Sequence, residues 1–232
     1  MNEILLIDKE PGWTSFDVVA KVRGTLNAIN FEKGLPRTKH GAKVGHAGTL
    51  DPFATGLLIV LTGAETKNQE SYMKQDKEYE ANLRLGYTSA TGDPEGDIEE
   101  MPKSKYQMPN QDQIKIVLND FTGKIEQTPP IYSAVKVNGE RAYKLARKGE
   151  EVEMKPRTVT INSLNILSYS FPDLRIRVKC SSGTYIRTLG EDIGKTLGCG
   201  AYLTALRRTK IGKYDVKNAH TVEGTIKALS AS

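Results

Sequence analysis

The chain has 232 residues, of which 38% are hydrophobic and 26% charged, a balance typical of a folded globular protein and not of a disordered one. No apolar run of about 18 residues is present, which excludes a membrane-spanning helix, and the N-terminus lacks a secretory signal pattern, so we expect a cytoplasmic protein. The two cysteines, Cys180 and Cys199, fit a reducing compartment, and neither has a His or Cys at metal-ligand spacing.

The net charge of +5 is unevenly distributed along the chain. Residues 133–213 contain 16 Lys and Arg against 7 Asp and Glu, a net charge of +9, so the remaining residues together carry −4. A basic segment of this kind is typical of a protein that binds a polyanion, most commonly nucleic acid. Charge alone does not distinguish such a surface from an ordinary solvated one.

The first elements predicted are a buried strand at Ile4–Ile7 and a turn at Pro11-Gly12. A helix follows that Thr14 or Ser15 can cap, and we expect it to end near Leu26. Its predicted buried side chains are Phe16, Val19 and Val22. Residues 28–43 show no periodicity and contain five Lys, Arg and His residues, which indicates a basic loop insertion.

The rest of the chain alternates between predicted strands, helices and turns. In chain order we expect a strand at Leu57–Leu61, a half-buried strand at Tyr79–Leu85, a loop over 88–109, a helix at Gln111–Phe121 stopped by Gly123, a strand at Ser133–Val137 with an Asn138-Gly139 turn, a short basic helix at Arg141–Lys148, a strand over 174–179 with one basic face, a helix at Thr184–Leu197 and an extended segment at Tyr202–Ile211. This order predicts an α+β fold with much antiparallel sheet.

The segment 45–60 is the most informative stretch of the chain. It places one carboxylate, Asp51, in a glycine-rich turn that leads directly into the apolar strand. Gly48 allows backbone angles that other residues resist, and Pro52 disfavours a helical conformation at Asp51. The pattern fits either a tight turn in which Asp51 caps backbone N–H groups or a catalytic acid held in a fixed position.

Residues 45–58, Gly-His-Ala-Gly-Thr-Leu-Asp-Pro-Phe-Ala-Thr-Gly-Leu-Leu, resemble the active-site motif of the TruB family of pseudouridine synthases. The resemblance continues, in order, through about residues 3–215. The further segments that carry it are Lys9–Ser15, Lys77–Ala81, Pro129–Lys136 together with Tyr143–Gly149, Cys180–Arg187 and Leu206–Thr209. It implies the pseudouridine synthase fold, an α+β fold with a bent, mostly antiparallel mixed sheet flanked by helices and a central catalytic cleft.

The family resemblance further implies a tRNA pseudouridine synthase, an isomerase that acts on the T-loop uridine at position 55 of tRNA after this nucleotide has been flipped out. The reaction needs no metal or redox chemistry, and the chain shows no dinucleotide fingerprint, so we expect no cofactor. The expected partner is tRNA through its T-stem-loop, with no guide RNA and no membrane, and we expect a monomer.

Three residues are expected to carry the chemistry. By resemblance Asp51 is the essential acid, whether it attacks the base, attacks the sugar or deprotonates the sugar. Arg187 is the expected counter-charge of Asp51, although its pattern alone also fits a surface arginine. Tyr79 is expected to stack on the target base and assist proton removal, although its position also suits a core tyrosine.

The remaining candidates are substrate or RNA contacts. His46 is expected to touch the flipped-out nucleotides or to be structural, Tyr185 to shape the pocket, and Leu206 to pack against the base or belong to the core. Charged candidates for RNA or pocket contacts, each of which also fits a solvated charge, are Lys9, Asp93, Lys136, Arg141, Lys144, Arg147, Arg207 and Arg208.

The chain departs from the family pattern at its C-terminal end. It continues only about twenty residues past Leu206–Thr209, too few for an RNA-binding PUA domain, so we expect one catalytic domain over 1–232 without that module. Two alternatives are a guide-RNA-dependent relative and a non-catalytic RNA-binding or RNA-folding protein. Intact Asp51, Tyr79 and Arg187 disfavour the second alternative.

Overall fold

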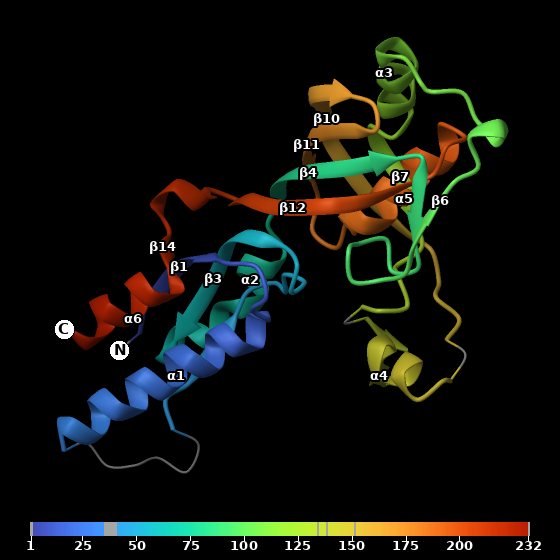
Figure 1. The fold of residues 1–232 in the computed structure, drawn as a ribbon. Helices are drawn as coiled ribbons and strands as arrows, with labels where there is room; N and C mark the ends of the chain where they lie inside the picture. Colours follow the sequence, from blue (N-terminus) through green and yellow to red (C-terminus); the bar gives the residue numbers. More distant parts are fainter. Residues whose placement is uncertain (1, 35–40, 134, 138, 151, 232) are drawn as a thin grey trace. The chain divides into compact units, whose positions relative to one another are not determined.

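The computed structural model describes residues 2–34, 41–133, 135–137, 139–150 and 152–231 (Figure 1). The chain divides into two compact units, one formed by residues 1–79 with 206–232 and the other by residues 80–205. The boundaries fall within two strands, β4 (Lys77–Leu85) and β12 (Ala201–Ile211), so each unit contains part of both. No helix in the described ranges is long and apolar enough to span a membrane.

The first unit is a sheet with strand order β14-β1-β3-β12. β1 (Ile4–Lys9) pairs antiparallel with β3 (Thr55–Thr62) and parallel with β14 (His220–Thr221), while β12 joins β3 in parallel. Two short strands extend it, β2 (Val44–His46) on β3 and β13 (Tyr214–Asp215) on β12. The helical segments of this unit are α1 (Ser15–Glu32), η1 (Gly63–Asn68), α2 (Gln69–Met73), η3 (Val216–Asn218) and α6 (Val222–Ser230).

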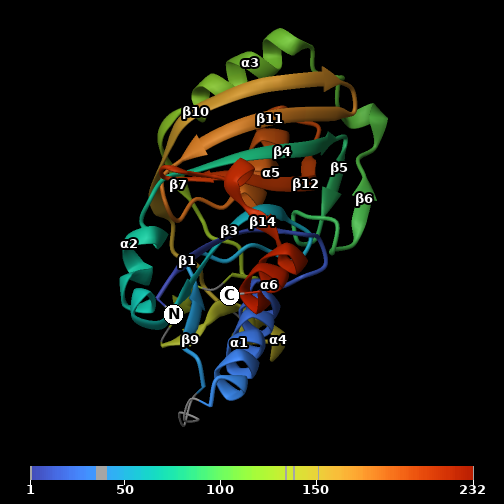
Figure 2. The same ribbon diagram turned by 90° about the vertical axis from the view of Figure 1, so that its left-hand side faces the viewer.

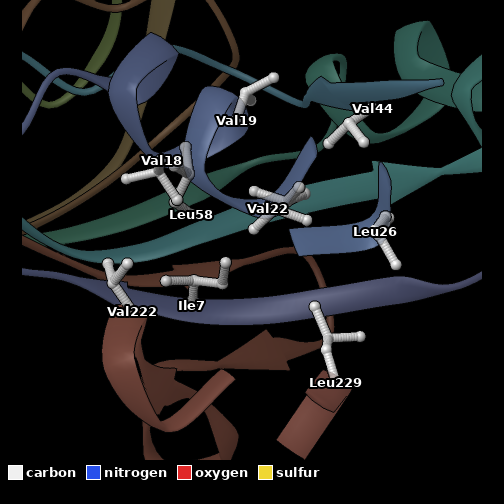
Figure 3. Packing of buried hydrophobic residues seen from close by; sticks show 10 residues of the cluster. Ile7, Val18, Val19, Val22, Leu26, Val44, Leu58, Val222 and Leu229 are labelled. Carbon is white, nitrogen blue, oxygen red and sulfur yellow. The ribbon is translucent and has the colours of Figure 1, made fainter. Parts of the chain in front are cut away.

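The core of this unit lies on both faces of β3. Leu58 packs with Ile7 and with Val18 and Val22 of α1, in a cluster that α6 completes through Val222 and Leu229 (Figure 3). Leu57, Ile59 and Leu61 alternate onto the opposite face and pack with Tyr72 and Ile211. Because both faces are covered, β3 reads as a continuous apolar run, as the sequence predicted.

Helix α1 begins as predicted and ends later. Thr14 caps it through a capping box with Asp17. The predicted end near Leu26 is wrong, because Ile29 extends the apolar face by another turn and the helix runs to Glu32, before Gly34 at φ +67°. Part of the expected loop 28–43 is therefore helical, and residues 35–40 lie outside the described ranges. The predicted burial of Phe16 is also wrong: its side chain is exposed, since Val18 and Val22 define the buried face.

The second unit has strand order β12-β4-β11-β10-β7, with β11 (Asp173–Cys180), β10 (Arg157–Ser170) and β7 (Gly123–Gln127). The pairs β10–β11 and β10–β7 are antiparallel. Helix α3 (Gln111–Asp120) packs against β10, as both ribbon views show (Figures 1 and 2), and α5 (Ile186–Thr196) contacts α3.

Smaller elements complete the second unit. The predicted loop 88–109 contains a hairpin of β5 (Tyr87–Ser89) and β6 (Ile98–Glu100) and the turn η2 (Lys103–Lys105); β6 is exposed throughout, so it lacks the alternation that marks a half-buried strand. A second hairpin joins β8 (Lys136–Val137) to β9 (Glu140–Arg141), next to α4 (Ala142–Arg147). Asn138 of the predicted turn lies outside the described residues.

Candidate active site

Asp51 lies in the turn between β2 and β3 of the first unit. Gly48 enters this turn at φ +107°, an angle that favours glycine, and Asp51 O accepts a hydrogen bond from Ala54 N at 3.1 Å. The Asp51 side chain is partly exposed, whereas the next strand is buried. The local sequence therefore presents one carboxylate at the end of a fixed strand.

Every backbone carbonyl from Gly48 to Pro52 accepts a hydrogen bond. On the C-terminal side of Asp51, Pro52 O accepts from Gly12 N at 2.9 Å and from Lys9 Nζ at 3.2 Å. Immediately before Asp51, the Ser15 hydroxyl accepts from Leu50 N at 2.8 Å and donates to Leu50 O at 3.1 Å. Residues of the segment 9–15 thus hydrogen-bond the backbone on both sides of Asp51, which fixes the turn.

Arg208 of β12 completes this set of hydrogen bonds. Its Nη2 donates to Gly48 O at 3.1 Å and its Nη1 to Thr49 O at 3.3 Å. The strand that carries Arg208 approaches β3 so closely that a Cβ on Gly56 would lie 2.3 Å from Arg208 O. Gly56 has φ +101°, so both its backbone angle and the lack of space require glycine.

Lys9 and Arg208 were predicted as RNA or pocket contacts, and the structure places both inside the first unit. The exposed fraction is 0% for Lys9 and 1% for Arg208. Besides Pro52 O, Lys9 Nζ donates to Glu10 O at 2.9 Å and Trp13 O at 2.8 Å. Protein carbonyls accept hydrogen bonds from the side chains that were predicted to contact RNA or the pocket.

The other predicted residues of the first unit differ in exposure. Tyr79 on β4 and Leu206 on β12 are 8% and 6% exposed, compatible with either the predicted role or a core position. His46 on β2 is partly exposed, and its carbonyl accepts from Gln69 Nε2 at 2.7 Å. Arg207 remains 41% exposed, although its two Nη atoms lie 3.0 and 2.7 Å from the Asp8 carboxylate.

In the second unit, Arg187 pairs with Asp93. Arg187 Nη1 lies 3.1 Å from Asp93 Oδ2, and the guanidinium also donates to Thr91 O and Tyr132 O, each at 3.0 Å. Asp93 Oδ1 accepts from Thr91 Oγ1 at 2.5 Å and Glu95 N at 3.0 Å. The pairing of Arg187 with Asp51 stays a prediction, since these residues belong to different units.

Glu191 follows Arg187 by one helical turn on α5. Burial raises the pKa of the Glu191 carboxyl, and repulsion from Asp192 raises it further, while Arg187 opposes the shift. A Cβ on Gly92 would lie 2.8 Å from Glu191 Oε1, so this carboxyl rests against the loop that carries Asp93. The group beside the ion pair is therefore easier to protonate than an ordinary glutamate.

Tyr185 is held at the start of α5 by a residue that the sequence analysis missed. Gln127 Oε1 accepts from Tyr185 N at 2.7 Å, and Gln127 Nε2 donates to Tyr185 O at 3.0 Å. The Arg157 guanidinium carbon lies 4.9 Å from the Tyr185 ring centroid, a cation–π distance. Gln127 is 1% exposed, and no local pattern marks it as a support for Tyr185.

The predicted basic contacts of the second unit lie around α4. Lys136, Arg141 and Lys144 are exposed, as an RNA contact requires. Arg147 belongs to α4, but its side chain lies outside what the structure describes. The exposure of Lys136, Arg141 and Lys144 is compatible with the predicted contacts.

Two family models match the chain over consecutive segments. Residues 36–186 match the N-terminal domain of the TruB family of pseudouridylate synthases, and residues 187–230 match a tRNA pseudouridylate synthase B C-terminal domain. The chain belongs to the TruB family. Asp51, Tyr79 and Asp93 fall in the first of these segments, and Arg187, Leu206 and Arg208 in the second. The two family models therefore cover both segments that carry candidate residues.

Individual relatives match almost the whole chain. The tRNA pseudouridine synthase B of Parabacteroides distasonis is 48% identical over 91% of this chain and 86% of its own length. That of Nitrosospira multiformis is 45% identical over 97% of this chain and 68% of its own length. These matches confirm the family predicted from the sequence motifs.

Solved structures give the same fold. A Cbf5–Nop10–Gar1 complex has a TM-score of 0.70 and 28% identity, and an H/ACA ribonucleoprotein bound to a substrate RNA containing 2′-deoxyuridine has a TM-score of 0.68 and 26% identity. This chain is covered to 97% in both, and it spans about half of those chains, 53% and 52%. The predicted α+β pseudouridine synthase fold is confirmed.

Proposed function

We propose that this protein converts a uridine of tRNA to pseudouridine. The match over 91% of the chain to a relative named tRNA pseudouridine synthase B carries the proposal. The fixed turn around Asp51 supports it, because isomerisation needs a carboxylate held in a defined position. We further propose that the target is the T-loop uridine at position 55.

The proposed reaction breaks the C1′–N1 glycosidic bond, rotates the uracil and joins C1′ to C5; the C5 proton is released and N1 takes up a proton. Atoms are conserved and there is no net redox change. Asp51 is the proposed essential acid, and Tyr79, on a buried strand of the same unit, is proposed to stack on the base and help move the proton. Arg187, Tyr185 and Leu206 are proposed to support the carboxylate and the base.

The target nucleotide must leave its stack to expose the reacting atoms, which costs a few kcal/mol and less in a loop than in a duplex. A folded T-stem-loop is therefore the proposed substrate, bound by a monomer in the cytoplasm without guide RNA. The exposed residues Lys136, Arg141 and Lys144 are proposed to contact its phosphates.

A tRNA transcript with tritium at uracil C5 tests the proposal, because isomerisation releases that hydrogen to water. We expect release without guide RNA, loss of release when uridine 55 is replaced by cytidine, and no release with Asp51→Asn, which should still bind the transcript. Release that appears only with an added guide RNA would favour the guide-dependent alternative. RNA binding without release would favour the non-catalytic one.

The second part of the test compares the isolated T-stem-loop with the full transcript at equal salt. We expect similar kcat/KM values, both falling as salt rises, because the proposed contacts are to phosphates of the loop region. A large preference for the full transcript would show that the protein reads tRNA beyond the T-stem-loop.

A further inference from the structure

Arg208 is a buried cation that holds the backbone on the N-terminal side of Asp51. Its Nε donates to Leu57 O at 2.8 Å, and its Nη1 and Nη2 donate to Thr49 O and Gly48 O. The acceptors thus lie on both arms of the turn, two and three residues before Asp51 and six residues after it. A planar guanidinium fixes the relative positions of acceptors in a way that a flexible ammonium does not.

Burying this cation is costly and needs compensation. The side chain is 1% exposed, and removal of a guanidinium from water is offset only when its donors are hydrogen-bonded. Here each of its nitrogens donates to a carbonyl of the turn or of β3. The position therefore fits a support of the turn better than a contact to RNA.

Ser15, an uncharged residue, hydrogen-bonds the backbone of the same turn. It is 2% exposed, and its hydroxyl holds both N and O of Leu50, the residue directly before Asp51. Arg208 and Ser15 come from opposite ends of the chain, yet their acceptors are consecutive residues. Two independent side chains therefore fix the direction in which the chain enters Asp51.

The geometry points to Arg208 as a positioning residue for the proposed reaction, one that sets the Asp51 carboxylate through the backbone of residues 48–50 and takes no part in RNA affinity. This inference rests on the proposed function. It predicts that weakening Arg208 lowers the rate of the chemical step and leaves RNA binding unchanged, because a misplacement of about 1 Å in a reacting group costs roughly 100-fold in rate.

The test measures the single-turnover rate of tritium release and the Kd for the tRNA transcript separately. For Arg208→Gln we expect a rate about 100-fold lower and a Kd within about threefold of wild type. Arg208→Lys should recover only part of the rate, because one ammonium cannot replace the planar three-point contact. Ser15→Ala should lower the rate with unchanged Kd. In the double variant of Ser15→Ala and Arg208→Lys, the rate should fall by less than the product of the two single reductions, since both side chains hold one segment.

Lys210→Gln is the matched control, because it removes a cation from the same strand that is 44% exposed and lies 3.8 Å from Glu78 and 3.9 Å from Asp215. It should leave the rate and Kd unchanged. A raised Kd with an unchanged rate in Arg208→Lys would overturn the inference in favour of an RNA contact. An unchanged rate and Kd would also overturn it.

Hydrogen exchange separates this inference from the proposed function. If wild type releases no tritium, the proposed function fails, but Arg208→Lys should still speed amide exchange at Leu50 and Ala54 relative to Lys210→Gln. Unchanged exchange at both amides would show that Arg208 does not fix the turn, whether or not the protein is active.

Discussion

Arg187 and Asp93 form an ion pair whose side chains are 6% and 4% exposed, while Arg187 also donates to two backbone carbonyls. The guanidinium therefore orders the loop around Asp93 and the segment at Tyr132 together. A buried pair of this kind contributes little net stability, but removal of one partner is costly.

We expect Arg187→Lys to lower the single-turnover rate at least about 100-fold, because one ammonium cannot hold acceptors spread over three directions. Asp93→Asn should lower the free energy of unfolding by about 2–3 kcal/mol, measured by urea titration. Asp173→Asn, which breaks an exposed pair with Arg84, is the control and should change stability little. Full activity of Arg187→Lys would show that the three-way contact is dispensable.

Replacing Tyr79 by Phe tests its hydroxyl separately from its ring. The ring should still stack, so we expect an unchanged Kd for tRNA, whereas loss of a group that moves a proton should slow turnover by about 10²-fold or more. Tyr202→Phe alters another buried tyrosine of the chain and should keep the wild-type rate. Equal rates for Tyr79→Phe and wild type would show that the Tyr79 hydroxyl is not needed and that the ring serves only in packing or stacking.

Gly56→Ala should destabilise the protein by at least about 2 kcal/mol and abolish activity, because its Cβ would collide with the backbone of Arg208 at a positive φ. Gly24→Ala is a suitable comparison, since Gly24 lies within α1 with nothing within 4 Å of the added Cβ. That change should stabilise the protein by about 0.5–1 kcal/mol. Thermal unfolding of both variants measures the contrast, and a neutral Gly56→Ala would contradict the close approach of the strands.

The carboxylate of Glu80 makes stability depend on pH. Hydrogen bonding to Arg177, followed by that to Arg175, lowers the pKa of Glu80. Because the folded-state pKa lies below the unfolded value of about 4.3, this contribution is present above that pH and is lost as the pH falls through the folded-state pKa.

We therefore expect Glu80→Gln to cost about 1 kcal/mol at pH 7, a modest value because both arginines are partly exposed. Urea titrations should show the difference from wild type shrinking below pH 4. The control Glu70→Gln breaks an exposed pair with Lys74 and should give no measurable change. A difference that persists undiminished at low pH would show that packing, and not charge, explains the loss.

The sequence predicted the helices and strands whose capping residues and buried side chains lie close together along the chain. Helix α3, predicted at Gln111–Phe121, is observed at Gln111–Asp120, since its cap and its apolar face lie within ten residues. Strand β10 was not predicted, because its Thr, Ser and Asn residues give no clear alternation, and its place between β7 and β11 is a long-range property. Helix α6 was missed as well.

In the candidate site, too, the local motif was predicted from the sequence and the contacts between distant residues were not. The motif around Asp51 identified the turn and the family, but Lys9 and Arg208 were expected at a surface because lysine and arginine are rarely fully buried. One acceptor of Lys9, Pro52 O, lies 43 residues away, and the acceptors of Arg208 lie 151 to 160 residues away. No local pattern in the sequence indicates that a charge will be enclosed by segments so distant.

The hydrogen bonds from Arg208 to the Asp51 turn join segments that are synthesised at different times. The carbonyls of Gly48 and Thr49 leave the ribosome 160 and 159 residues before the guanidinium that they bind. At about 5–20 residues per second, a nascent chain would carry an incomplete turn for roughly 8–30 s. An Asp51 turn held in this way cannot form until β12 has been made, so we expect a chain that still lacks β12 to modify RNA at a strongly reduced rate.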